Sequence, residues 1–185
     1  MEKNTSLLEW GPISLVRRNH GLEHATLNLL SELYPHESFA GHSDTQGFWV
    51  IGNISTDVLF SVVNQALERM RNGEQNLAIH PNCGTNLVTS GVVVGTFVWL
   101  GTLVPAKTFR RKLDRWPTLV LLATSALSLS RPLGPIVQKK ITTSGNPGDL
   151  SVVQITRYER QGPLMHRVRT AISASAPEPV QEAEA

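Results

Sequence analysis

The feature that most constrains the fold is an apolar run, LVTSGVVVGTFVWLGTLV, which covers residues 87–104 without a single charge. A helix of about 20 residues crosses the hydrocarbon core of a bilayer, so this run is long enough to span it. A buried helix of a soluble core is the alternative interpretation. The basic segment that follows, at 107–115, and Trp116 at a position typical of the membrane interface favour the membrane.

A second apolar run covers residues 117–137 and is interrupted by Arg131 and two prolines. We interpret it as an imperfect second span, so residues 87–138 predict a transmembrane helical hairpin. A charge in hydrocarbon is costly, and Arg131 is therefore expected to reach toward a polar surface. Gly91 and Gly95 form a GxxxG step, which predicts a close approach of the two helices.

The sequence does not determine on which side of the membrane the N-terminal domain lies. The five basic residues of the connector 107–115 predict that this loop lies in the cytoplasm. An N-terminal domain of 86 residues would then have to be exported, although no basic region followed by an apolar run indicates a signal peptide.

Residues 1–86 predict a small α/β domain. Apolar residues at helical spacing predict one helix over 14–33 and another between 55 and 72. Aromatic and β-branched residues predict a strand over 47–54, and a second strand is expected over 76–80. Strand, helix and strand in succession predict a right-handed crossover with the two strands parallel.

The chain beyond the hairpin predicts a second β element over 139–173. Two runs at 151–159 and 164–172 have the pattern of a β-hairpin. Because two strands alone are marginally stable in water, this hairpin is expected to join the sheet of the first domain. The acidic tail, 174–185, has few apolar residues and is expected to be disordered. The fold class is therefore predicted as α+β.

Charge and cysteine content exclude several classes. There are 17 basic and 15 acidic residues, a net charge of +2, so we expect no nucleic-acid partner. Cys83 is the single cysteine, which excludes an internal disulfide. Membrane lipids are the expected partners, together with a peptide or protein bound by the α/β domain. The oligomeric state is left open.

The segment RNHGLEHATLNLL contains two histidines four residues apart, His20 and His24, with Glu23 between them. Residues at this spacing lie on one face of a helix, so both imidazoles can bind one metal ion. Zinc is the expected metal, and Glu23 could accept a proton from a metal-bound water. The structural alternative is that these side chains serve packing and hydrogen bonding. The chance of the pattern is roughly one such chain in a hundred.

A zinc site needs a third protein ligand. The segment HPNCGTN at 80–86 offers His80 and Cys83. Cys83 could instead be a small buried apolar side chain, and the residues around it could form a turn that caps the apolar helix. Further donors precede the strand at 47–54: His36, Glu37, His42 and Asp44.

The pattern formed by His20, Glu23 and His24 resembles the inverted zinc-peptidase motif, H-x-x-E-H. By that resemblance the two histidines are zinc ligands and Glu23 is the general base. The inverted peptidases take a further glutamate from a downstream helix, which has no counterpart at a comparable place here.

Four segments together resemble an uncharacterised domain family of bacterial membrane proteins, associated with cyanobacteria and Chloroflexi-like bacteria. They are RRNHGLEHATLNLLSE, AGHSDTQGFWVIGN, LAIHPNCGTNLV and RPLGPIVQKKITTSG, and the resemblance covers roughly residues 15–170. HGLEHAT and HPNCGTN are its signatures. The resemblance implies a membrane hairpin and a location in the bacterial inner membrane, and it implies no activity.

Three functions follow as hypotheses. The first is a membrane-tethered zinc hydrolase, peptidase-like, in which His20, His24 and either Cys83 or His80 hold zinc and Glu23 activates water. The second is a non-enzymatic membrane module with a structural or sensory metal site, or a site for a protein partner. The third is a lipid-modifying enzyme that acts at the bilayer surface.

Overall fold

The computed structural model of the chain describes residues 7–105, 108–159 and 162–172, so the predicted acidic tail lies outside the described residues. Contacts divide the chain into two compact units. The first, here called the sheet unit, contains residues 1–80 and 139–185, and the second, the hairpin unit, contains residues 81–138.

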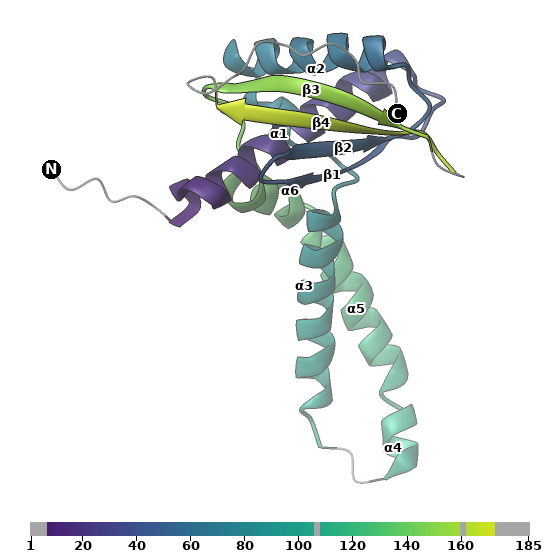
Figure 1. Cartoon of the computed structure of the whole chain (residues 1–185). Coiled ribbons are helices and arrows are strands. Elements are labelled where there is room, and N and C mark those ends of the chain that lie inside the picture. The colour runs from purple at the N-terminus through teal and green to yellow at the C-terminus, as the bar shows by residue number, and fades with distance from the viewer. Residues whose placement is uncertain (1–6, 106–107, 160–161, 173–185) are drawn as a thin grey trace, which may run out of the picture. The chain divides into compact units, whose positions relative to one another are not determined.

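The sheet unit is built on four antiparallel strands in the order β1-β2-β4-β3. Its strands are β1 (Ala40–Asp44), β2 (Gly47–Ile51), β3 (Leu150–Tyr158) and β4 (Met165–Ile172). Helices α1 (Gly11–Leu33) and α2 (Thr56–Arg71) lie on one face of this sheet, as Figure 1 shows, with α1 against β1 and β2 and α2 against β3. The short helices η1 (Leu7–Glu9), η2 (Gln75–Ala78) and η3 (Gln138–Thr142) complete the described elements outside the hairpin.

The core lies between the two helices and the sheet. Helix α2 begins where the Ser55 hydroxyl accepts a hydrogen bond from the Val58 N–H at 3.4 Å, as an N-cap. Its buried side chains recur every three or four residues and meet the inward face of the strands. Alternate residues of β2 and β4 are fully buried in this core: Phe48, Val50, His166 and Val168.

The α+β class is confirmed, and so is the prediction that the C-terminal hairpin joins the sheet, since β4 pairs with β2. The predicted strand over 76–80 is wrong: Gln75–Ala78 form η2, and the sheet has no parallel pair among its described strands. A strand would pair its carbonyls with a neighbouring strand, but here side chains of α1 bind the carbonyls of this segment. Asn28 donates to the Leu77 and Ile79 carbonyls at 2.9 and 3.0 Å, and His24 bonds the Ala78 carbonyl at 2.9 Å.

Strand β1 was not predicted because its sequence, AGHSD, has no apolar alternation. It lies at the edge of the sheet and pairs with β2 across a two-residue turn, with Gly47 at φ +140°. Glycine is needed there because a Cβ at residue 47 would lie 2.0 Å from the Val168 carbonyl oxygen.

The hairpin unit contains α3 (Gly84–Thr102), α4 (Phe109–Leu113), α5 (Trp116–Ser130) and α6 (Leu133–Val137). Helices α3 and α5 run side by side, and α4 lies at the end of the unit away from α6 (Figure 1). The GxxxG prediction is wrong for this pair, because a Cβ on Gly91 or Gly95 would meet nothing within 4 Å in the described chain. The helices approach instead at Gly101, which faces Leu119 and Leu122, and at the Ser90 and Ser130 hydroxyls, 2.9 Å apart.

By length and composition, α3 could cross a membrane: it has 19 residues and a mean hydropathy of 1.2 in its most apolar window, none of which is buried. A second candidate consists of two helical stretches, Arg110–Ser130 and Leu133–Thr142, bent by 46° at the break between them.

His166 makes stability sensitive to acid. Its side chain is 0% exposed, and burial, with a smaller contribution from the Arg157 charge, lowers its pKa below the ordinary 6.5. The unfolded chain therefore binds a proton at a higher pH than the folded chain. The contribution of the neutral, buried His166 to stability is fully present above pH 6.5 and is lost as the pH falls below that value. The melting temperature of the wild type should fall between pH 7.5 and pH 5.5, and that of His166→Gln should fall less. An equal drop in both proteins would contradict this prediction, and His36→Gln, at an exposed site, is the control.

Candidate metal centre

Two histidine side chains meet on the face of α1 that turns away from solvent. His24 is 2% exposed and His20 is half-buried. Their ring centroids are 4.3 Å apart in an edge-to-face arrangement, and a donor nitrogen of one lies within 4.8 Å of a donor nitrogen of the other. The spacing of one helical turn therefore brings the two imidazoles together, as the sequence predicts.

Each of these rings is oriented by a backbone carbonyl. His20 Nδ1 lies 3.0 Å from the Thr142 oxygen, and His24 Nδ1 lies 2.9 Å from the Ala78 oxygen. A carbonyl oxygen accepts hydrogen bonds and cannot donate them, so Nδ1 carries the hydrogen in both rings. The lone pair is then on Nε2 in each, which is the tautomer that binds a metal ion through Nε2.

The two carbonyls belong to segments that connect the sheet unit to the hairpin unit along the chain. We call residues 74–80 the leading segment and residues 139–145 the returning segment. The returning segment lies so close to α1 that a Cβ at Gly21 would be 2.1 Å from the Ser144 carbonyl oxygen. The glycine of the HGLEHA signature is therefore the residue that lets this backbone approach the helix.

Arg17 fixes the returning segment on the same helix. Its guanidinium donates to the carbonyl oxygens of Ile141 at 2.8 Å, Thr143 at 3.2 Å and Lys140 at 3.4 Å. The Ser144 N–H in turn donates to the Arg17 carbonyl at 2.8 Å. These bonds hold the Thr142 carbonyl where it orients His20.

His80, the last residue of the leading segment, completes a row of three imidazoles. Its ring lies 5.7 Å from the His24 ring, and its Nδ1 is 2.7 Å from the Asn28 Oδ1 atom. The Asn28 amide nitrogen donates to carbonyls of the same segment, so its oxygen is the atom that accepts from His80. Burial and the neighbouring His24 lower the pKa of His80, which favours the neutral form that binds metals.

Glu23 faces β1. Its side chain is 4% exposed and accepts a hydrogen bond from the Ser43 hydroxyl, and a Cβ at Gly41 would lie 2.4 Å from its Oε1 atom. Burial raises the pKa of this carboxyl, against the Ser43 hydrogen bond and the charges of His20 and His42. A raised pKa is a property that carboxyl groups acting as general bases share.

Cys83 belongs to the hairpin unit and is the residue before α3. Its sulfur accepts a hydrogen bond from the Thr85 N–H at 3.4 Å, as the N-cap of this helix. Two imidazole nitrogens as close as those of His20 and His24 could bind one metal ion, and zinc takes nitrogen ligands of this kind.

The other predicted donors have different positions. His36 is exposed in the loop after α1, and His42 is exposed on β1. The Asp44 carboxylate, which lies on the same strand, is paired with Arg167 at 2.7 Å. In the described part of the chain, neither histidine belongs to a group of three metal donors.

Sequence reasoning missed Asn28, Arg17 and Gly21. Asn28 has a readable signal, because it continues the four-residue series of His20 and His24 on one stripe of α1. In the returning segment, the atoms that Arg17 and Gly21 contact are backbone atoms more than 120 residues away in the chain. No local pattern indicates such partners.

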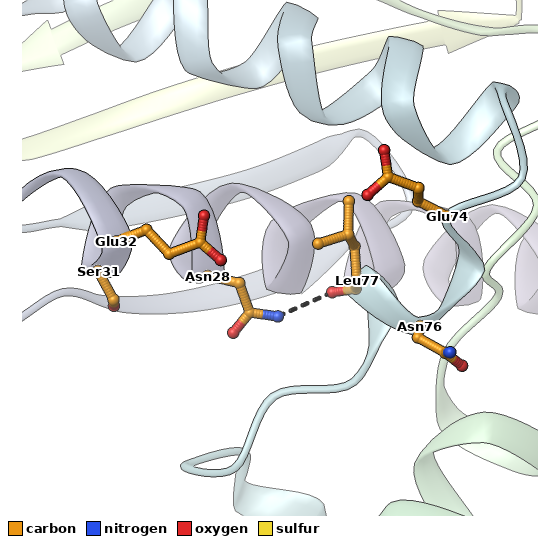
Figure 2. A pocket seen from close by; sticks show the side chains of 6 residues that line it. All are labelled: Asn28, Ser31, Glu32, Glu74, Asn76 and Leu77. Atoms are coloured by element: carbon orange, nitrogen blue, oxygen red, sulfur yellow. Dashed lines mark hydrogen bonds between the residues drawn. The ribbon is translucent and has the colours of Figure 1, made fainter.

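A surface cavity of about 500 Å³ lies beside this stripe (Figure 2). Asn28 lines it together with Ser31, Glu32, Glu74, Asn76 and Leu77. Figure 2 shows the Asn28 amide bonded to the Leu77 carbonyl, so the residue that orients His80 also borders this cavity. Its Glu74 carboxylate is already paired with Arg69, whose Nε donates at 2.9 Å.

Comparison with known proteins shows the family of the chain. No solved structure matches it. A protein of the cyanobacterium Picosynechococcus sp., itself described as uncharacterised, is 35% identical over 169 residues, which cover 83% of this chain and 78% of the relative. The profile of one family matches residues 15–155, and the protein therefore belongs to the family described as Domain of unknown function (DUF6391).

Proposed function

We propose that this protein is a membrane-anchored zinc protein whose site performs hydrolysis, with a peptide as the substrate class. The observation that carries the proposal is the orientation of both α1 histidines by backbone carbonyls, at 3.0 and 2.9 Å. Metal-binding histidines characteristically donate their other ring N–H to such an oxygen. Two histidines that only pack in a core would not require the same tautomer in both rings.

Cys83 is the proposed third ligand. It follows His80 by three residues, and three residues of chain span at most about 11 Å. Covalent connection thus keeps the thiol near the histidine cluster of the sheet unit. With two imidazoles and one thiolate, a fourth position is available for water, which is the arrangement of catalytic zinc.

Glu23 is the proposed general base. Burying a carboxylate against a single hydroxyl destabilises a fold, so its place in α1 needs a reason other than stability. Zinc held by these ligands would supply an activated water, and the Glu23 carboxylate would be the group that accepts its proton. The H-x-x-E-H spacing puts the carboxylate one residue from His24 and on the turn that begins with His20.

Membrane insertion of the hairpin is proposed from its surface. Large apolar side chains of α3 and α5 are exposed along both helices: Val88, Val92, Trp99, Leu100, Leu121 and Leu129. A patch of this extent is unfavourable in water and suits lipid. Trp116, 68% exposed at the start of α5, has the place of an interfacial anchor.

The test combines metal analysis with a hydrolysis assay on the full chain in neutral detergent. We expect one zinc per chain by elemental analysis and cleavage of a fluorogenic casein. Glu23→Gln should keep the metal and lose the cleavage. A protein without stoichiometric transition metal would refute the proposal.

Glu23→Gln should also change stability in a direction that depends on metal. Because the folded pKa of Glu23 is raised above its ordinary 4.5, the wild type loses stability as the pH rises above that value. Glutamine cannot ionise, so the variant does not lose this stability, which amounts to about 1.4 kcal/mol for each pH unit by which burial raises the pKa of Glu23. The metal-free variant should therefore melt above the metal-free wild type at pH 8.

Zinc should reduce that difference, because a neighbouring cation favours the ionised carboxylate. Differential scanning fluorimetry with and without zinc measures both effects. If zinc leaves the difference between the two proteins unchanged, Glu23 is not beside the metal.

A structural or sensory metal site is the second candidate function. It is favoured by His80, whose Nδ1 is bound to an oxygen in the same way as those of the other two histidines. Three imidazoles and the Cys83 thiolate would close a four-ligand site with no position for water. X-ray absorption spectroscopy on the zinc form distinguishes one sulfur with three nitrogens from an open site with a bound water.

A further inference from the structure

The hairpin unit contains a cavity of about 270 Å³ that the metal centre does not use. It lies where α3 begins and α5 ends, and Arg131 lines it with Ser90, Ser130, Asn86 and Pro81. Polar side chains line this cavity, although both helices are otherwise apolar.

The walls of this cavity are fixed by short contacts. Asn86 donates to the Pro81 carbonyl at 2.6 Å and accepts from the Gln138 amide at 2.6 Å. Helix α6 packs on the same residue, since a Cβ at Gly134 would be 2.3 Å from the Asn86 Oδ1 atom. The cavity is therefore built by the fold.

Arg131 is at this place because α5 ends at Ser130 and a proline follows the arginine. Its backbone forms the break between the two bent helical stretches. The Ser130 hydroxyl lies 2.9 Å from the Ser90 hydroxyl, so a polar pair from both helices lines the cavity together with Arg131.

Among the residues that the structure describes, the charge of Arg131 has no acidic partner. Asp114 is the single acidic residue between 81 and 138, and it follows α4, at the other end of the unit. None of the ion pairs in the described chain includes Arg131. A guanidinium without a carboxylate, lining a cavity with hydroxyl groups, is suited to bind a phosphate through two N–H groups.

We propose that this cavity binds a phosphate group, and specifically the headgroup phosphate of an anionic membrane lipid. This inference rests on the proposed insertion of the hairpin. In an inserted hairpin, the ends of α3 and α5 that border the cavity lie toward the bilayer surface, where headgroup phosphates are found. The basic residues around α4 would occupy the opposite surface, so each end of the hairpin carries positive charge.

Thermal unfolding of the full chain in neutral detergent tests the site. The probes are a short-chain phosphatidylglycerol, a neutral galactolipid without phosphate, and inorganic phosphate. We expect phosphatidylglycerol to raise the melting temperature by several degrees and the galactolipid to have little effect. Arg131→Gln should lose more than half of the shift, Arg131→Lys should retain part of it, and Arg115→Gln, in the basic connector, should retain all of it.

An equal shift in Arg131→Gln and the wild type would overturn the proposal, and so would an equal shift from the galactolipid. A shift from inorganic phosphate as large as that from the lipid, with the same dependence on Arg131, would support a phosphate site whose ligand is the free ion. Flotation with galactolipid vesicles tests insertion separately. A chain that does not float refutes the membrane hairpin, while the inorganic phosphate arm still tests the cavity.

Discussion

Replacement of His24 by alanine is expected to abolish stoichiometric zinc binding. Loss of an outer-shell partner alone lowers metal affinity by roughly 10–100-fold, and the loss of a ligand should exceed that range. His24 is the central ring of the cluster, with His20 at 4.3 Å and His80 at 5.7 Å between ring centroids. Competition with a chromophoric chelator measures the affinity of the wild type and the variant.

The matched control is His36→Ala, because His36 is an exposed histidine beyond the end of the same helix. The zinc affinity of this variant should equal that of the wild type.

Cobalt in place of zinc then identifies the third ligand, since a thiolate bound to cobalt gives a charge-transfer band that an imidazole does not. The band should vanish in Cys83→Ser and remain in His80→Ala. If His24→Ala binds zinc as tightly as the wild type, no metal site exists at α1.

The helical part of this fold could be predicted from sequence because its signals are local. The apolar spacing and N-cap of α2 lie within its own 16 residues, and His20 and His24 share a face because of helical geometry alone. The same holds for the C-terminal hairpin, whose two strands are adjacent in the chain. In each of these elements the partners are neighbours, so a short pattern determines the outcome.

The strand predicted at 76–80 could not be rejected in this way. NLAIH has the composition of a strand, but side chains of α1, about 50 residues earlier, bind its carbonyls. One of these bonds orients His24, and the other two hold the Asn28 amide, whose Oδ1 atom accepts a hydrogen bond from His80. Sequence therefore identified candidate ligands, but the groups that orient the His20 and His24 rings are backbone carbonyls, which every residue has.

The GxxxG step in α3 illustrates a related difficulty. Small residues allow close packing, but the sequence does not say on which side of the helix the neighbour lies. The glycine with a packed neighbour is Gly101, near the other end of α3, where Leu119 and Leu122 approach. In α1 the informative glycine was Gly21, and its neighbour is the returning segment, more than 120 residues later.

Gly21→Ala should therefore strongly destabilise the sheet unit. The new Cβ would lie 2.1 Å from the Ser144 carbonyl oxygen and 3.1 Å from its carbon, and both are backbone atoms that a rotamer change cannot move. Overpacking of this kind costs about 3 kcal/mol, well above the roughly 1 kcal/mol that alanine gains over glycine inside a helix. The net loss of about 2 kcal/mol should lower the melting temperature of the full chain in detergent by roughly 6 °C.

Gly11→Ala provides the comparison within the same helix, because a Cβ at Gly11 would meet nothing within 4 Å in the described chain. That variant should melt at or slightly above the wild type.

Gly21→Ala has a second consequence that simple destabilisation would not produce. Ser144 can relieve the overlap by moving away from α1, and Thr142, two residues earlier, would move with it and release His20 Nδ1. Zinc affinity measured well below the melting temperature should then fall by roughly 10–100-fold, as for loss of an outer-shell partner. Unchanged affinity in a destabilised Gly21→Ala protein would mean that the returning segment supports the fold without orienting the metal ligand.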